Sequence, residues 1–263
     1  MSPVSPLSPV SPVSRATDLY ARAEQGFDER LALALSLLKT AAQAHAGQVV
    51  QTSSLGAEDM VITDLIVRHG LMLPVATLDT GKLHAQTLAL LPRIEAHYGI
   101  RVERWQPVEE STVHFERQHG EQVMRTSVAL RQACCALRKL EPLARLLQHR
   151  SAWVTGLRRE QADSRAGLAA VETDAQGRQK FSPLADWSWA DVWHYIDRFE
   201  VPYNALHDQS FPSIGCAPCT RAVTLGEDLR SGRWWWEQPQ EVKECGLHRS
   251  PSATSSAPSS ATA

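Results

Sequence analysis

Hydrophobic and polar positions follow two periods along this chain. Short runs rich in Val, Ile, Trp and Thr are typical of β-strands. These runs are residues 48–53, 74–78, 100–105 and 151–155. Longer stretches space their apolar residues as amphipathic helices do. These stretches are residues 28–46, 59–69 and 83–98. Asp28 is expected to cap the first helix, and Pro92 is expected to kink the third.

The alternation of strand and helix predicts an α/β fold in a single domain. The sheet should be mainly parallel and twisted, with helices on both faces. In such sheets ligands bind beyond the carboxyl ends of the strands. The loops that follow the predicted strands are therefore where chemistry is expected.

The two ends of the chain differ from the rest in composition. Residues 1–14 contain a Ser-Pro repeat, and residues 250–263 are rich in Ser, Ala and Thr. Proline lacks a backbone donor, and neither segment has the apolar residues that a core requires. We expect two disordered tails around a folded domain of residues 15–249.

Charge and hydropathy narrow the class of protein. The 263 residues carry 27 Lys and Arg against 29 Asp and Glu. This near neutrality disfavours a nucleic-acid or anionic-lipid binder. No apolar run has the roughly 18 residues of a membrane span, and no secretory signal pattern begins the chain. We therefore expect a cytoplasmic protein with reduced thiols.

The first loop, residues 53–59, reads SSLGAED and lies between a predicted strand and a predicted helix. Small hydroxyl residues, a glycine and the first amides of a helix can hold phosphate or sulfate oxygens. It is not a Walker loop, because the GK[ST] ending is missing. The alternative is an ordinary strand-to-helix turn with a serine cap.

The second loop, residues 78–81, reads LDTG and also follows a predicted strand. The same DTG string occurs in aspartic proteases, but these need a paired carboxylate on a β-rich fold. The strand and helix alternation disfavours that interpretation. The alternative to a ligand-binding loop is a turn with its own Asx hydrogen bond.

The third loop, residues 155–165, follows the last predicted strand and carries Arg158, Arg159 and Arg165. Guanidinium groups can bind an anion in a bidentate manner. A solvated charged loop is the alternative. Because three such loops should meet at one edge of the sheet, we expect a nucleotide site there.

Four of the five cysteines occur in two close groups. Cys134 and Cys135 lie in a helical pattern, whereas Cys216 and Cys219 lie in a loop-like CAPC string. Grouped thiols in a reducing compartment favour a soft-metal site, either zinc or iron–sulfur. An adjacent pair is unusual for zinc. Lys139 comes one helical turn after Cys135 and would offset the negative charge of such a site.

Cys245 is the remaining thiol and lies in the string KECGLH. Lys243 and His248 would favour its thiolate, whereas Glu244 would oppose it. The choice is between a nucleophile and an incidental surface cysteine. Upstream, Arg230 and Arg233 are three residues apart and would share one face if that stretch is helical.

These motifs together resemble a known enzyme family. SSLGAED, LDTG, TGLRREQADSR and KECGLH are similar to the assimilatory sulfonucleotide reductases, whose adenosine-binding domain belongs to the nucleotide α-hydrolase group. The CC pair and CAPC are typical of the iron–sulfur adenylyl-sulfate (APS) reductases, rather than of the cluster-free phosphoadenylyl-sulfate (PAPS) reductases. The resemblance covers nearly all of residues 28–248.

The resemblance implies roles for particular residues. Cys245 would be the catalytic nucleophile. One [4Fe–4S] cluster per chain would be held by Cys134, Cys135, Cys216 and Cys219. The substrate would be bound by Ser53, Ser54, Gly56, Ala57, Glu58, Asp59, Leu78, Asp79, Thr80, Gly81, Lys139, Gly156, Arg158, Arg165, Arg230, Arg233 and His248.

The implied reaction belongs to sulfate assimilation toward cysteine. The Cys245 thiolate would attack the sulfur of adenosine 5′-phosphosulfate, AMP would leave, and reduced thioredoxin or a glutaredoxin-like protein would release sulfite from the S-sulfonate. The segment of residues 238–249 should be mobile so that one sulfur meets two partners. The alternatives are a PAPS reductase and a zinc-stabilised nucleotide-binding module without redox activity. A homo-oligomer is also considered, because relatives often associate.

Overall fold

A computed structural model describes residues 15–224 and 226–237 of the chain. Its strands are β1 (Val49–Ser53), β2 (Val75–Leu78), β3 (Val102–Trp105), β4 (Ala152–Val154), β5 (Val171–Thr173) and β6 (Gln179–Phe181). Its α-helices are α1 (Ala16–Tyr20), α2 (Phe27–Ala44), α3 (Ala57–Arg68), α4 (Ala85–Tyr98), α5 (Glu109–His119), α6 (Val128–Cys135), α7 (Glu141–Leu146) and α8 (Trp189–Arg198). A π-helical turn, Ala136–Leu140, joins α6 to α7. Short 3-10 turns are Val123–Arg125, Arg159–Gln161, Asp163–Arg165, His207–Gln209 and Ala217–Cys219.

The strands form one sheet in the order β3-β2-β1-β4-β6-β5. Every neighbouring pair is parallel except β5 and β6, which are antiparallel. The prediction of a mainly parallel α/β sheet is therefore confirmed. The four predicted strands are present with shorter bounds. Strands β5 and β6 were not predicted, because they have only three residues each and include exposed polar side chains.

The helices also follow the prediction, with one wrong detail. Helix α2 begins at Phe27, and its N-cap is Gly26, whose φ is 80°. Asp28 lies in the first turn and is not the cap. Gly26 adopts this left-handed conformation without the steric cost that a side chain would bring. Helix α4 continues through Pro92 and ends at Tyr98.

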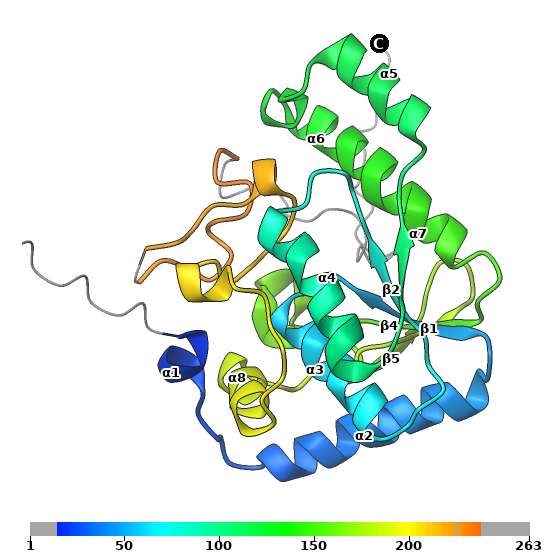
Figure 1. Ribbon diagram of the computed structural model, residues 1–263, viewed down its shortest axis with the longest axis vertical. Helices are drawn as coiled ribbons and strands as arrows, with labels where there is room; N and C mark the ends of the chain where they lie inside the picture. Colours follow the sequence, from blue (N-terminus) through cyan, green and yellow to red (C-terminus); the bar gives the residue numbers. More distant parts are fainter. Residues whose placement is uncertain (1–14, 225, 238–263) are drawn as a thin grey trace, which may run out of the picture.

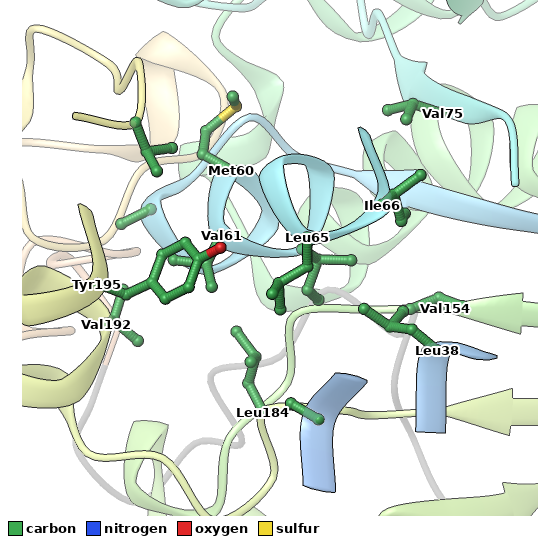
Figure 2. Close-up of a cluster of buried hydrophobic side chains, with 14 of the residues drawn as sticks. Leu38, Met60, Val61, Leu65, Ile66, Val75, Val154, Leu184, Val192 and Tyr195 are labelled. Carbon is green, nitrogen blue, oxygen red and sulfur yellow. The ribbon is translucent and has the colours of Figure 1, made fainter. Parts of the chain in front are cut away.

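The two faces of the sheet pack against different helices. The larger core lies between one face and helices α2, α3, α4 and α8, where Leu38, Leu65 and Val154 are in the same buried cluster (Figure 2). On the other face, Val50, Ala76 and Trp153 pack with leucines of α7 and its end. Alternate strand residues point to opposite faces, so adjacent Val49 and Val50 join different cores. Figure 1 shows α5 and α6 beyond the sheet, at the top of the view.

The order of strands creates a crevice where β1 and β4 lie side by side. The chain passes from β1 to β2 and β3 on one side, and β4 continues to β6 on the other. Loops that leave β1 and β4 therefore diverge at this point, which is where ligands bind in open parallel sheets. Gln51 of β1 fixes the start of α3, because its Nε2 donates to the Asp59 carbonyl at 2.7 Å.

The helices of the described part of the chain were also considered as membrane spans. None of them combines the length and the apolar character needed to cross a bilayer.

Candidate active site

A cleft of about 410 Å³ opens beyond the carboxyl ends of β1, β2 and β4. Most of the predicted substrate residues meet there. Those that line the cleft are Ser53, Ser54, Gly56, Glu58, Asp59, Leu78, Thr80, Lys139, Gly156, Arg158, Arg165, Arg230 and Arg233. Ala57, Asp79 and Gly81 belong to the same loops but are not part of this lining. His248 and Cys245 lie outside the described residues.

Asp59 joins the loop after β1 to the loop after β4. Its carboxylate accepts hydrogen bonds from the amide and hydroxyl of Ser54, both at 2.6 Å, and from the Gly156 amide at 3.0 Å. A Cβ on residue 156 would lie 2.5 Å from Asp59 Oδ1, so only glycine fits. Burial raises the pKa of Asp59 to about 6, although the hydrogen bonds from Ser54 oppose this. Asp59 is therefore a buried cross-link between two loops of the cleft.

The loop after β1 also contains a strained residue. Leu55 has a φ of 61° and is buried, whereas Gly56 is the extended N-cap of α3. A bulky residue in the left-handed region is uncommon and costs free energy. The Ser54 side chain is not the cap of α3, so the alternative of a serine-capped turn is wrong. Its hydroxyl binds Asp59 instead.

Arg158 is almost fully buried and pairs with carboxylates of the cleft itself. Its guanidinium donates to Glu58 at 3.0 Å and to Glu160 at 2.7 Å. Burial alone would raise the pKa of Glu58, but the charge of Arg158 and a hydrogen bond from Gln161 hold it below its usual value. Arg159 pairs with Asp186, and Arg165 donates to Gln161. The arginines of this loop are thus engaged by acceptors of the chain.

The loop after β2 lines the cleft and is also held in place by hydrogen bonds to Asp79. Asp79 accepts hydrogen bonds from Arg104 at 2.7 Å, Gln106 at 2.9 Å and the Gly81 amide at 3.2 Å. The last of these is the Asx turn considered from the sequence. Burial would raise the pKa of Asp79, but the hydrogen bonds from Arg104 and Gln106 lower it.

Arg233 comes from the last described segment of the chain and also lines the cleft. Its guanidinium stacks over the Trp234 ring at 4.6 Å and donates to the Ser213 hydroxyl and the Ile214 carbonyl. A Cβ at Gly215 would overlap the guanidinium, so glycine permits this close approach. Arg230 lies in a turn and Arg233 in an isolated β-bridge with Thr220, yet both line the cleft. The condition of a shared helix face is not met.

The two cysteine groups meet in a second, smaller cavity. Cys134, Cys135, Cys216 and Cys219 all line it, together with Lys82, Arg131, Arg138 and Lys139. Burial raises the pKa of Cys134, and it raises that of Cys219 to about 12, where the neighbouring Cys216 adds to the effect. A metal centre reverses this preference, since bound thiols are deprotonated. The four cysteines are free thiols and form no disulfide with one another.

The donor set of this cavity fits an iron–sulfur cluster. Among the described residues no histidine or carboxylate lines it, and thiolates are the ligands that hold such clusters. Within the described ranges no three His, Cys, Asp or Glu side chains are placed to hold a metal ion. A cubane does not require convergence on one atom, because each of its four thiolates binds a different iron.

Lys139 lines both the cleft and the cysteine cavity. The sequence placed it one α-helical turn after Cys135, whereas the structure places it in the π-helical turn Ala136–Leu140. Such wide turns are frequent at functional sites. The two cavities therefore share a cationic side chain at their boundary.

Sequence reasoning missed several residues of the cleft. Trp189 and His207 are buried in its wall, and His207 is surrounded by the rings of Trp189, Trp193 and Tyr203. Burial lowers the pKa of His207 to about 4. No motif marks these residues. Trp189 begins α8 and His207 lies in the 3-10 turn that follows this helix, so only the tertiary packing brings both residues to the cleft.

Comparisons with known proteins show the family of the chain. Residues 48–222 match the model of the phosphoadenosine phosphosulfate reductase domain family. A protein of Allochromatium vinosum named adenosine 5′-phosphosulfate reductase is 55% identical over 76% of this chain and 78% of its own length. A protein of the same name from Sinorhizobium fredii is 44% identical over 82% of this chain and 86% of its own length.

Solved structures give the same fold. The phosphoadenylyl-sulfate (PAPS) reductase of Candida auris in its phosphate complex has a TM-score of 0.60 and 27% identity, over 75% of this chain and 97% of its own. The FMN adenylyltransferase of Candida glabrata has a TM-score of 0.55 and 15% identity, over 84% and 78%, and shows the fold alone. The chain therefore belongs to the phosphoadenosine phosphosulfate reductase domain family.

Proposed function

We propose that this protein reduces adenosine 5′-phosphosulfate to sulfite and AMP. The observation that carries the proposal is the boundary between the two cavities, where Lys139 lies beside both the nucleotide cleft and the four thiols. Relatives that are 44–55% identical bear the name of this activity. An oxidoreductase of this kind serves sulfate assimilation.

Two sets of residues that line the cleft suit the two ends of this substrate. The loop wall, residues 53–59 and 155–165, offers backbone amides and carboxylates already engaged with Arg158. The cationic wall consists of Lys139, Arg230 and Arg233. Adenosine is neutral and the phosphosulfate is anionic. We therefore place the nucleoside against the loop wall and the phosphosulfate against the cationic wall.

Cys245 is the nucleophile in this proposal. Its thiolate attacks the substrate sulfur, the bond from sulfur to the phosphate oxygen breaks, and AMP leaves with the electron pair. Lys139, Arg230 and Arg233 stabilise the charge that develops on the phosphate and sulfate oxygens. His248, which follows Cys245 by three residues, joins this group of cations. The product is an S-sulfonate on Cys245.

A separate protein thiol completes the reaction. A thiolate of reduced thioredoxin, or of a glutaredoxin-like protein, attacks the Cys245 sulfur and expels sulfite. The second thiol of the donor then resolves the mixed disulfide, so that the donor is oxidised and the Cys245 thiol returns. A cytoplasmic location suits these reduced partners.

Cys134, Cys135, Cys216 and Cys219 would hold one [4Fe–4S] cluster. When bound, the cluster supplies a fixed negative charge of about −2, from a core of two positive charges and four thiolates. The electrons for reduction come from thiols, so no change in its oxidation state is needed. Lys139 is the residue of the cleft that faces this charge.

Intact mass after incubation with substrate, without any thioredoxin, tests the proposal. The wild-type chain should gain the mass of one sulfonate with adenosine 5′-phosphosulfate, and Cys245→Ser should gain none. Because a PAPS reductase structure has the same fold, the 3′-phosphorylated substrate is run in parallel. A wild-type chain that gains no sulfonate from either substrate would contradict the proposal.

The metal content of the purified protein distinguishes the proposed reductase from a zinc-stabilised nucleotide-binding module. About four irons per chain in anaerobically purified protein is expected for the cluster. One zinc and no iron would instead support a nucleotide-binding module without redox activity.

A further inference from the structure

Glu116 of α5 lies between two cations beside the cysteine cavity. Its carboxylate pairs with Lys82 Nζ at 2.7 Å and with Arg138 Nη2 at 2.8 Å. The pKa of Glu116 is held below its usual value, chiefly by the hydrogen bond from Lys82. None of the described residues that line the cleft belongs to α5. Figure 1 shows this helix at the far end of the molecule from α2.

Both cations line the cavity of the four thiols. Arg138 is also fixed from the other side, because its Nη1 donates to the Thr80 carbonyl at 2.8 Å. The Thr80 hydroxyl in turn lies 3.3 Å from Cys216 Sγ, and the Lys82 carbonyl accepts from the Ala217 amide at 2.7 Å. Glu116 therefore holds a segment that connects the cleft loop to the second cysteine pair.

Cationic side chains surround the four cysteines. Four cations line the cavity, and they are Lys82, Arg131, Arg138 and Lys139. Two carboxylates pair with members of this set, because Glu116 binds Lys82 and Arg138 while Glu237 binds Arg131. Glu116 thus offsets one of the two positive charges that Lys82 and Arg138 bring to the cavity, where a four-thiolate cluster would add a charge of about −2.

We infer that Glu116 is a positioning residue that fixes both the place and the effective charge of Lys82 and Arg138 at the cysteine cavity. This inference rests on the proposed function, because it assumes that the cavity holds an anionic metal–thiolate group. Outer-shell partners orient metal sites and are often worth about 10- to 100-fold in metal affinity. Glu116 would act on the metal site indirectly, because it contacts Lys82 and Arg138 and not the thiols.

Two variants separate the two parts of the inference. Glu116→Gln keeps the size and one hydrogen-bond acceptor but removes the negative charge. Glu116→Ala removes both. Glu110→Gln is the matched control, because Glu110 lies on the same helix and is exposed. All are made in the full chain with its metal loaded.

The measurements are the rate of iron loss to a chelator and the midpoint potential of the cluster. Glu116→Ala should lose iron about 10-fold faster than wild type. Glu116→Gln should show a more positive midpoint potential, because an added net positive charge favours the incoming electron. Glu110→Gln should match wild type. Iron loss unchanged in Glu116→Ala, or a potential unchanged in Glu116→Gln, would overturn the inference.

A compensating substitution gives a readout that general loosening of the fold would not produce. Lys82→Met removes one positive charge and should shift the midpoint potential in the negative direction. Combined with Glu116→Gln, it should return the potential toward the wild-type value, because the net charge is restored. Shifts of the same sign in both single variants would contradict the inference. Wild-type protein without iron would instead contradict the proposed cofactor.

Discussion

The two walls of the cleft differ in how their charged side chains are paired. On the loop wall, Arg158 is buried and bound by Glu58 and Glu160. On the cationic wall, Arg233 is also buried, but it contacts a carbonyl, a hydroxyl and an indole ring. The described part of the chain supplies no carboxylate to Arg233. Two buried arginines thus line one cleft with different amounts of charge left for a ligand.

This difference shows that the number of arginines in a loop is a poor guide to anion binding. A guanidinium whose charge is already neutralised positions its acidic partners, whereas one held by neutral groups keeps its positive potential. The loop that follows β4 contains more arginines, but we expect the cationic wall to bind the phosphosulfate. The same reasoning applies at the cysteine cavity, where Glu116 and Glu237 neutralise part of the cationic charge.

Arg233→Ala should have the largest effect. Loss of a buried donor that faces developing charge lowers kcat/KM by about 100- to 1,000-fold. Sulfite release measured at steady state is the readout. Arg221→Ala is the control, because Arg221 is partly exposed and pairs with Glu227 in the neighbouring loop. Activity of Arg233→Ala within a few-fold of wild type would remove the distinction between the walls.

The pH dependence of stability tests the buried carboxyl of the loop wall. The pKa of Asp59 is raised from 3.8 to about 6, so the folded state binds this proton more tightly than the unfolded chain. The free energy of unfolding should therefore fall as pH rises from about 4 to 6, by about 3 kcal/mol, and then level off.

A variant that lacks the Asp59 carboxyl tests whether this group causes the pH dependence of stability. Asp59→Asn should have a flatter profile in urea unfolding between these pH values. Asp28→Asn, at a side chain that is 81% exposed, should keep the wild-type slope. Identical slopes in wild type and Asp59→Asn would show that the raised pKa does not contribute.

Gly156→Ala should have the smallest effect of the three. The added Cβ would lie 2.5 Å from Asp59 Oδ1 and 3.2 Å from the Asp59 amide, so the two loops must move apart. Overpacking of this kind costs about 1–3 kcal/mol of stability. Gly167→Ala is the control, because nothing lies within 4 Å of its Cβ. Thermal unfolding with and without AMP should show lower stability and weaker ligand stabilisation for Gly156→Ala alone.

Much of the fold could be predicted from the sequence because its signals are local. Apolar spacing located four strands and three long helices, and their alternation implied the parallel sheet. Strands β5 and β6 carried no such signal, since each has only three residues and their sequences, VET and QKF, mix polar and apolar positions. Gly26 also replaced Asp28 as the cap of α2, because a left-handed residue there turns the chain into the helix.

The site was predicted more completely than its electrostatics. Motifs brought Ser53, Gly156 and Lys139 into one proposed site, and the cleft contains all three. Trp189 and His207 were missed because a single aromatic residue in a buried segment reads as ordinary core. The pairing of Arg158 with Glu58 could not be predicted, because Glu58 lies 100 residues earlier in the chain.

The sequence by itself determined the local elements, the glycines at tight loops and the division of the cysteines into two pairs and a single thiol. Only the tertiary structure decided that the two pairs share a cavity, that Lys139 stands at its boundary with the cleft, and which arginines are neutralised. The physical reason is the separation along the chain of the residues that interact. Helix and strand preferences depend on neighbours along the chain, whereas charge pairing depends on which loops the order of strands brings together.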